Sequence, residues 1–218
     1  MKSVKNRKYP VLAFLVLGFF SLHAYAGRPL LVDDAGVNDK GHGHVEAWYA
    51  RGAEKNNSWH IAPAYSPTDW LEITAAFSRD NSEKFNSKGL TAKILFSPSK
   101  ESGCNPGVLA GFSQTNGHSH TDTHVTGLLT CNTVTYGSVH FNLGISALAD
   151  TSPVHMGIAY EKPIGPVTAN LEIFKERYSK PITQIGLRGY ILPRIQLDGS
   201  IGRQGSDTIF SIGTKIEF

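Results

Sequence analysis

The densest group of reactive side chains in this sequence is a set of three histidines and an aspartate between Gly117 and His124. The imidazoles of His118, His120 and His124 are of the kind that bind transition metals. Ligands with this spacing on a polar, glycine-containing stretch define a metal site only weakly, and such stretches are typical of solvated loops. We therefore expect a surface loop and no resident metal or cofactor, with these histidines as the candidate ligands.

Nucleophilic catalysis would need a serine, a histidine base and an orienting asparagine or acid within hydrogen-bond reach. His140, Asn142 and Ser146 fall on one side of an alternating run, and Ser119 lies between two histidines. Neither Gly-x-Ser-x-Gly nor His-Glu-x-x-His nor a phosphate-binding glycine loop occurs in the sequence. We assign no catalytic residue and expect a protein that is not an enzyme.

Charged and histidine side chains recur at alternate positions through most of the chain, with apolar residues between them. Side chains alternate across a β-strand, so the pattern predicts strands with one apolar and one polar face. Buried charges must pair or stay hydrated, so the polar faces would form either a structural network or a gated polar path. The candidate lumen residues are Glu46, His60, Glu72, Lys93, His140, His155, Glu172, Arg188, Asp198 and Lys215.

Twelve such strands are expected, and each is close to the ~9–11 residues that a tilted strand needs to cross a bilayer. Connections after the even strands are short, apart from Ser97 to Pro106, whereas those after the odd strands are longer and more polar, as in outer-membrane barrels. Pro63 should mark a bulge or an edge-like site. The expected strands are 44–53, 57–66, 70–79, 88–97, 107–115, 122–132, 136–147, 153–162, 166–176, 182–191, 194–203 and 208–218.

The fold class predicted by this pattern is all-β: an antiparallel up-and-down transmembrane β-barrel of about 12 strands. Its last strand should pair with residues 44–53, because a closed barrel leaves no open sheet edge in lipid. Phe210 and Phe218 should mark opposite ends of the apolar stripe on that strand. A soluble β-sandwich is the alternative, although it would rarely give twelve strands in uninterrupted order.

Residues 1–26 have the build of a secretory signal peptide, with a basic start, an apolar run from Val11 to Leu22 and the small-x-small sequence Ala24-Tyr25-Ala26. A membrane anchor is the alternative, but the run is shorter than the ~20 residues of a spanning helix. Removing four basic residues leaves 17 basic against 18 acidic residues, so no nucleic-acid footprint remains. Residues 27–43 would form a periplasmic segment that could plug the lumen, and 44–218 the barrel.

Cys104 and Cys131 are the two cysteines of the chain. In an exported protein they are expected to form a disulfide, with two free thiols as the alternative. In an antiparallel hairpin, the numbers of opposite residues have a constant sum. Residues 104 and 131 have the same sum, 235, as residues 117 and 118, so a hairpin centred between 117 and 118 would place the two cysteines opposite each other.

The stretch from Arg28 to Gly36 reads Arg-Pro-Leu-Leu-Val-Asp-Asp-Ala-Gly, and Gly41 to Trp48 reads Gly-His-Gly-His-Val-Glu-Ala-Trp. Both resemble the start of the Gram-negative outer-membrane transporter family associated with the meta pathway of phenol degradation, with Val32 where threonine is frequent. The resemblance implies a porin-like barrel in the outer membrane that passes small, hydrophobic or aromatic solutes. A structural or lipid-modifying barrel is the alternative.

The same resemblance draws attention to Arg28, Asp33 and Asp34 before the first strand. The two aspartates could cap a turn, bind a cation or pair with Arg28 as the segment folds into the lumen, and turn and plug contacts are the favoured interpretation. The terminal Phe218 resembles the C-terminal signal of outer-membrane barrels and is the expected contact for the barrel assembly machinery. Deleting it should impair assembly more than activity. The other expected partners are outer-membrane lipid and a small solute.

Overall fold

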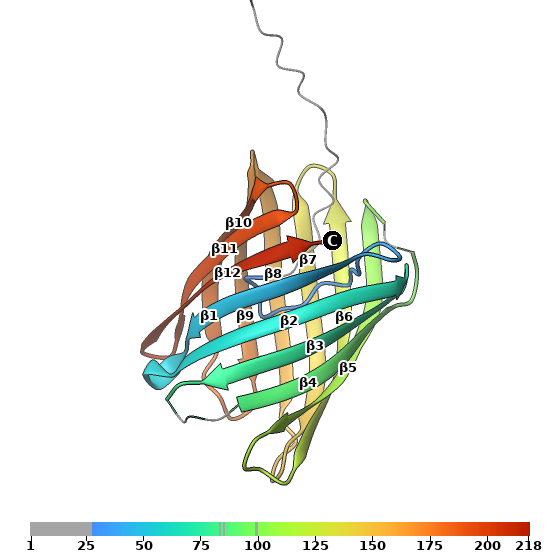
Figure 1. Cartoon of the computed structure of the whole chain (residues 1–218). Helices are drawn as coiled ribbons and strands as arrows, with labels where there is room; N and C mark the ends of the chain where they lie inside the picture. Colours follow the sequence, from blue (N-terminus) through green and yellow to red (C-terminus); the bar gives the residue numbers. More distant parts are fainter. Residues whose placement is uncertain (1–27, 83, 85, 99) are drawn as a thin grey trace, which may run out of the picture.

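The computed structural model describes residues 28–82, 84, 86–98 and 100–218. The expected signal peptide therefore lies outside the described residues. Twelve antiparallel strands form one closed barrel (Figure 1), which confirms the predicted fold class and strand number. The strands are β1 Gly43–Arg51, β2 Asn57–Thr68, β3 Leu71–Asp80, β4 Asn86–Leu95, β5 Gly103–Thr115, β6 Thr121–Thr133, β7 Gly137–Ala147, β8 Val154–Ile164, β9 Val167–Glu176, β10 Ile182–Leu192, β11 Ile195–Gln204 and β12 Asp207–Glu217.

Each strand pairs with its neighbours in sequence, and β12 closes the ring against β1 with Phe210 opposite Arg51. The backbone of Phe218 continues this pairing, because its N–H and C=O bond to Gly43 over 2.9 and 3.0 Å. The predicted closure of the last strand on the first is therefore confirmed. Among the described residues, the helical element is the short 3-10 turn η1 Ala53–Lys55, and no helix there is long and apolar enough to cross a membrane.

The two faces of the wall differ in the way the alternation predicts. Leu143, Ile185 and Ile212 are among many large apolar side chains that point outward and are more than half exposed. Among the described residues, 21 buried side chains are polar or charged and 9 are apolar, so the interior of this barrel is polar. The small apolar interior cluster consists of Ala35, Val37, Leu95 and Leu128, with Leu109 packed beside it.

One local expectation was wrong. Strand β4 ends at Leu95 and β5 begins at Gly103, so the long turn is shorter than predicted. Side-chain bonds explain this: the Lys100 N–H donates to Asn105 Oδ1 over 2.8 Å, while the Asn105 and Asn132 amides donate to Lys100 O. At Pro63 the pairing of β2 with β3 is interrupted, as at a sheet edge, but the register shift falls further on, between Tyr65 and Thr68.

The disulfide is confirmed: Cys104 and Cys131 are directly opposite in the β5–β6 pair and are joined. Gln114 faces Thr121 in the same ladder, so the hairpin is centred where the sequence places it. The covalent bond ties the base of this hairpin beside the long β4–β5 turn.

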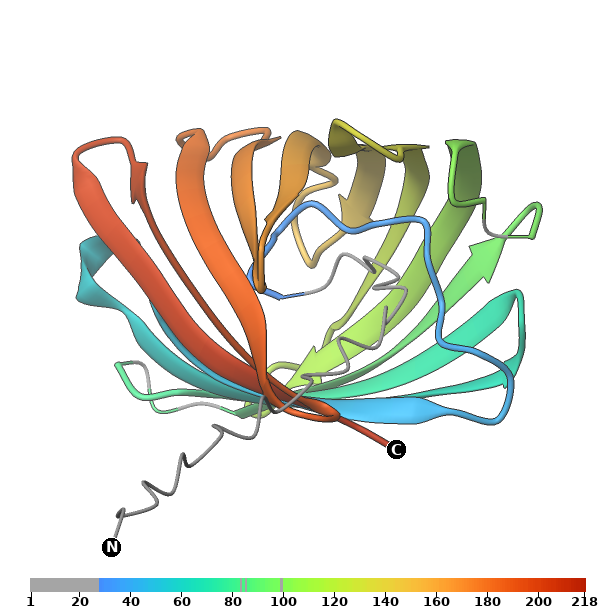
Figure 2. The same ribbon diagram turned by 90° about the horizontal axis from the view of Figure 1, so that it is seen from above.

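Residues 28–42, which we call the N-terminal segment, lie inside the ring of strands. Figure 2 shows the segment, in blue, crossing the lumen before it turns into β1. It has no regular secondary structure over most of its length, so its backbone groups depend on the wall for hydrogen-bond partners.

Candidate functional site

The first half of the N-terminal segment, residues 28–32, is held by the carboxylate of Glu172 on β9. The backbone N of Leu31 lies 2.9 Å from both carboxylate oxygens, and the backbone N of Val32 lies 2.8 Å from Oε2. Gln184 on β10 donates to the same carboxylate and, over 3.1 Å, to Pro29 O. Glu172 is buried, and these charge-assisted bonds compensate for part of the cost of burying its charge.

Arg28 completes the contacts of this half. Its Nη2 lies 3.1 Å from Asp198 Oδ1 and 2.9 Å from Ser211 Oγ, and its guanidinium stacks over Trp48 at 4.6 Å from the ring centroid. Burial lowers the pKa of the Arg28 guanidinium, and the charges of Asp198 and then Glu46 oppose that shift. Arginine titrates far above neutral pH, so Arg28 stays charged across the physiological range.

Two glycines of the wall make room for the first half. A Cβ built on Gly157 would lie 2.5 Å from Val32 Cγ2, and one built on Gly186 would lie 2.8 Å from Pro29 Cγ. Both separations are shorter than real Cβ contacts, so a larger residue at either position would displace the segment or the wall. Only glycine permits this close approach without such a shift.

Asn142 on β7 binds the backbone where the two halves of the segment meet. The Asp33 N–H donates to Asn142 Oδ1 over 2.7 Å, and Asn142 Nδ2 donates to Asp33 O over 2.8 Å. Two residues later, the Ala35 N–H donates to Thr130 Oγ1 over 2.8 Å. The wall therefore binds the backbone of the segment at successive points through side chains.

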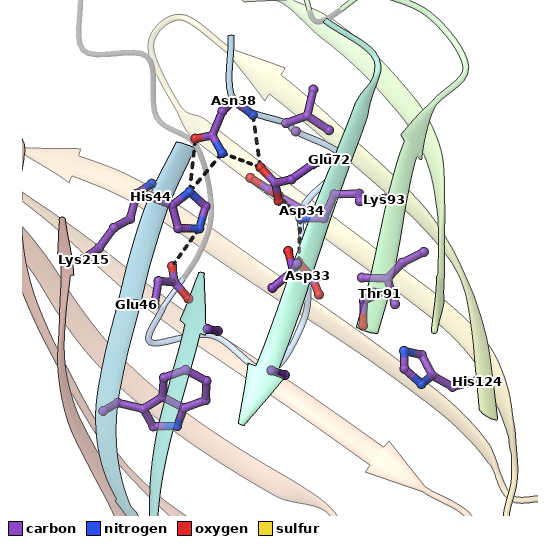
Figure 3. A pocket seen from close by; sticks show the side chains of 17 residues that line it. Asp33, Asp34, Asn38, His44, Glu46, Glu72, Thr91, Lys93, His124 and Lys215 are labelled. Carbon is purple, nitrogen blue, oxygen red and sulfur yellow. Dashed lines mark hydrogen bonds and ion pairs between the residues drawn. The ribbon is translucent and has the colours of Figure 1, made fainter. Parts of the chain in front are cut away.

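The second half, residues 33–38, adds two ion pairs to these backbone hydrogen bonds. Lys93 Nζ on β4 lies 2.8 Å from Asp33 Oδ1 and 3.0 Å from Asp34 Oδ1 (Figure 3). Glu72 on β3 accepts from the Asn38 amide over 2.6 Å and from its backbone N–H over 3.2 Å. Asp33 and Asp34 therefore pair with Lys93, whereas Arg28 pairs with Asp198.

Two cavities flank the second half. One, of about 290 Å³, lies against β1 and β3–β6 and contains the side chains of Glu46, Lys93 and Lys215. The other, of about 650 Å³, reaches the β4–β5 and β6–β7 turns. Residues 34 and 36–38 line both, so this short stretch of backbone separates the two spaces. A third cavity of about 190 Å³ shares Asp33, Leu109 and His124 with the first.

The remaining candidate lumen residues bond mainly to the wall. His155 Nε2 lies 2.8 Å from Thr126 Oγ1, and His60 stacks on Trp48 with ring centroids 4.5 Å apart. Lys215 Nζ lies 3.3 Å from Glu217, and Glu46 lies 3.9 Å from His44. These side chains line the interior without contacting the N-terminal segment through a hydrogen bond or ion pair in the described residues.

His140 and Arg188 converge on Glu161, which the candidate list omits. Arg188 Nη2 lies 2.8 Å from Glu161 Oε2, and His140 Nε2 lies 3.5 Å from the same oxygen. His140 Nδ1 is also 2.9 Å from Thr130 Oγ1, which links this group to Ala35 of the segment. Three further wall side chains that bond to the N-terminal segment were not among the predicted lumen residues: Asn142, Gln184 and Thr130. All lie on polar faces, so the alternation was the signal that could have found them.

The three candidate metal ligands do not gather. His118 and His120 lie at the tip of the β5–β6 hairpin, where His120 is 3.9 Å from Asp122, while His124 lies inside the barrel and lines the first cavity. Within residues 28–218, apart from the three undescribed positions, no group of three His, Cys, Asp or Glu side chains is placed to hold a metal ion.

The sequence matches no protein-family model, and it matches no curated protein. Solved outer-membrane barrels share the fold. The KdgM porin, in a structure with disordered oligogalacturonate, aligns with a TM-score of 0.66 at 10% identity over 81% of this chain and 99% of the porin. An outer-membrane channel from Pseudomonas putida F1 aligns with a TM-score of 0.66 at 10% identity, over 85% of this chain and 98% of the channel. For the Acinetobacter baumannii outer-membrane protein Omp33, the TM-score is 0.57 at 10% identity, over 84% of this chain and 100% of Omp33.

Proposed function

We propose that this protein is a channel for small solutes in the outer membrane of a Gram-negative bacterium, and that its N-terminal segment is a plug that gates the lumen. The observation that carries the proposal is the segment itself: it lies across a polar lumen and is held by hydrogen bonds and ion pairs to individual wall side chains. Such bonds can exchange with water as the plug moves. A segment buried in an apolar core could move only at the cost of exposing apolar surface.

The membrane location follows from the wall. A closed barrel pairs the backbone groups of its strands within the sheet, which is the condition for spanning lipid. Its apolar outer face suits contact with the hydrocarbon. The predicted signal peptide would export the chain, and the fold shared with porins and channels supports the same location. The connections after the odd strands, five or six residues long except for the two-residue β11–β12 turn, would then face the cell exterior and the chain ends the periplasm, with the seven-residue β4–β5 connection as the exception on the periplasmic side.

Passage would follow the three cavities, the third of which lies against β5–β9. The third and first cavities share lining residues, and the stretch 34–38 closes the way from the first cavity to the second. The resemblance to the phenol-degradation transporter family supports small organic solutes, including aromatic ones, as cargo.

Conductance of the purified barrel in planar bilayers tests this proposal. The mature protein should show small or intermittent currents, and a variant lacking residues 28–38 should conduct several-fold more, because the barrier between the cavities is gone. Heat-modifiable migration on gels would establish that both barrels are folded. If the folded deletion variant carries no current, the proposal that the barrel is a channel is wrong. If it carries the same current as the mature protein, the proposal that the segment is a plug is wrong.

A further inference from the structure

The charged residues on the outward-facing positions of the strands are all basic. Acidic residues are present in the strands, but every one falls on a lumen-facing position, as Glu72, Glu172 and Asp198 illustrate. A chance distribution would place carboxylates on both faces, so the outer surface of the wall is selectively cationic. The outward-facing charged residues are Arg51, Arg79, Lys88, Lys162, Lys175 and Arg203.

Five of the six lie at the same end of the barrel. Arg51 is the last residue of β1, and Lys88 is the third residue of β4. The second-last residues of β3, β9 and β11 are Arg79, Lys175 and Arg203, respectively. All these positions adjoin the connections that follow odd strands. Lys162 is the exception, near the opposite end of β8.

The five are spread over two thirds of the ring. In the closed order they fall within eight consecutive strands, from β9 through β12 and β1 to β4, whereas β5–β8 contribute none. We call this row the cationic arc: Arg51, Arg79, Lys88, Lys175 and Arg203. Strands two apart are about 10 Å apart, so the cations of β9, β11, β1 and β3 are spaced at roughly this interval.

Aromatic residues lie beside the cations of the arc on the neighbouring strands. Phe210 is opposite Arg51 in the β1–β12 pair, and Trp59 is opposite Arg79 in the β2–β3 pair. Tyr49 contacts both aromatic rings, with centroids 5.1 Å from Trp59 and 5.9 Å from Phe210. Aromatic rows of this kind lie at the boundary between the hydrocarbon and the headgroups, so the cations stand at headgroup depth.

The charges of the arc are available to an external partner. Arg79, Lys88 and Arg203 are exposed, and within the described chain no residue of the arc forms an ion pair with a carboxylate. Lys175 donates to the backbone of Ser179, and that hydrogen bond leaves its charge uncompensated. Cations at headgroup depth attract phosphate, and arginine binds phosphate through two parallel hydrogen bonds.

We propose that the cationic arc binds lipid A, the phosphorylated glycolipid of the outer leaflet. This inference rests on the proposed outer-membrane location, but not on conduction. The asymmetry favours a glycolipid over an ordinary phospholipid, because phospholipid phosphates at the other end of the barrel would meet only Lys162 among the outward-facing strand cations. A lipid with two phosphates and several acyl chains fits an arc that combines several cations with a broad apolar face.

Binding of fluorescent lipid A to the full mature protein in zwitterionic detergent tests the proposal. The variant Arg51→Gln/Arg79→Gln/Arg203→Gln should bind about a hundredfold more weakly, since each cation near an anionic lipid surface contributes about fivefold. Lys162→Gln is the matched control and should bind like the unmodified protein. Lipid A stripped of its phosphates should bind the unmodified protein as weakly as intact lipid A binds the triple variant.

Three results would overturn the assignment. The first is equal lipid A affinity of the triple variant and the unmodified protein. The second is a loss of lipid A affinity in Lys162→Gln as large as that in the triple variant. The third is binding of phosphatidylglycerol as tight as that of lipid A, which would make the arc a general anion surface. Heat-modifiable migration shows that each variant is folded. The conductance of the triple variant should match that of the unmodified protein, so a failure of lipid binding and a failure of the channel proposal would be recorded separately.

Discussion

Residues 28–32 and residues 33–38 lie in the same lumen, but the wall holds them in different ways. The first half is fitted against glycines and bound through its backbone by a buried carboxylate, Glu172. The second half combines hydrogen bonds with the ion pairs of Asp33 and Asp34 with Lys93, and cavities lie on both sides of it. Under the proposed function, the first half is the anchor of the plug and the second half is the part that moves as a gate.

The largest effect should come from releasing the anchor. Glu172→Leu removes the acceptor of the Leu31 and Val32 N–H groups, and each charge-assisted bond contributes about 1.5–3 kcal/mol. We expect the whole plug to leave the lumen and the conductance to approach that of the deletion variant. Protease sensitivity of the segment in the folded barrel would report the release. An unchanged protease pattern with unchanged current would show that Glu172 is not the anchor.

Releasing only the gate should have a smaller effect. Lys93→Met leaves Asp33 and Asp34 without their cation, and breaking a buried ion pair costs about 3–5 kcal/mol. The open fraction in single-channel records should rise, while residues 28–32 stay protected from protease. Lys215→Met is the matched control, because Lys215 lines the same cavity but pairs with Glu217. If the two variants behave alike, the effect is one of lumen charge and not of gating.

The junction should show the smallest effect. Asn142→Ala removes two hydrogen bonds to the backbone of Asp33, each with a net contribution of about 1 kcal/mol. Both ends of the plug keep their other contacts, so we expect a modest rise in the open fraction, below that of Lys93→Met. If the open fraction rises more than in Lys93→Met, the Asn142 hydrogen bonds, and not the Lys93 ion pairs, are the main contacts that hold the gate closed.

Much of the wall was predictable from the sequence, because strand alternation has a period of two and each strand repeats it. The twelve strands, the closure by β12 and the Cys104–Cys131 bond follow from that period and from hairpin geometry. The error occurs where side chains override the pattern. Asn105 and Asn132 shorten the long turn.

The contacts of the plug were not predictable in the same way. Alternation tells which face a residue is on, but it does not tell which residue of an irregular segment comes to rest against it. Lys93 is 59 residues from Asp34 and Glu172 is 140 residues from Val32, so their pairing depends on the closed ring. The sequence therefore identifies Lys93 and Glu172 as lumen residues without separating the gate contact from the anchor contact.

A reversible cross-link between residues 33–38 and the wall would show whether movement of this stretch opens the lumen. A Cβ on Gly107 would lie 3.7 Å from Ala35 Cβ, within the ~3.5–4.5 Å range of disulfides, and 2.9 Å from the backbone oxygen of Ile94, so a cysteine there requires a small shift between β4 and β5. Ala35→Cys/Gly107→Cys would be recorded in the Lys93→Met background, with the single Ala35→Cys variant as the control for oxidant and reductant. We expect oxidation to abolish the current of the double variant and reductant to restore it. Equal currents in the oxidised and reduced states, with the cross-link verified by mass spectrometry, would contradict it.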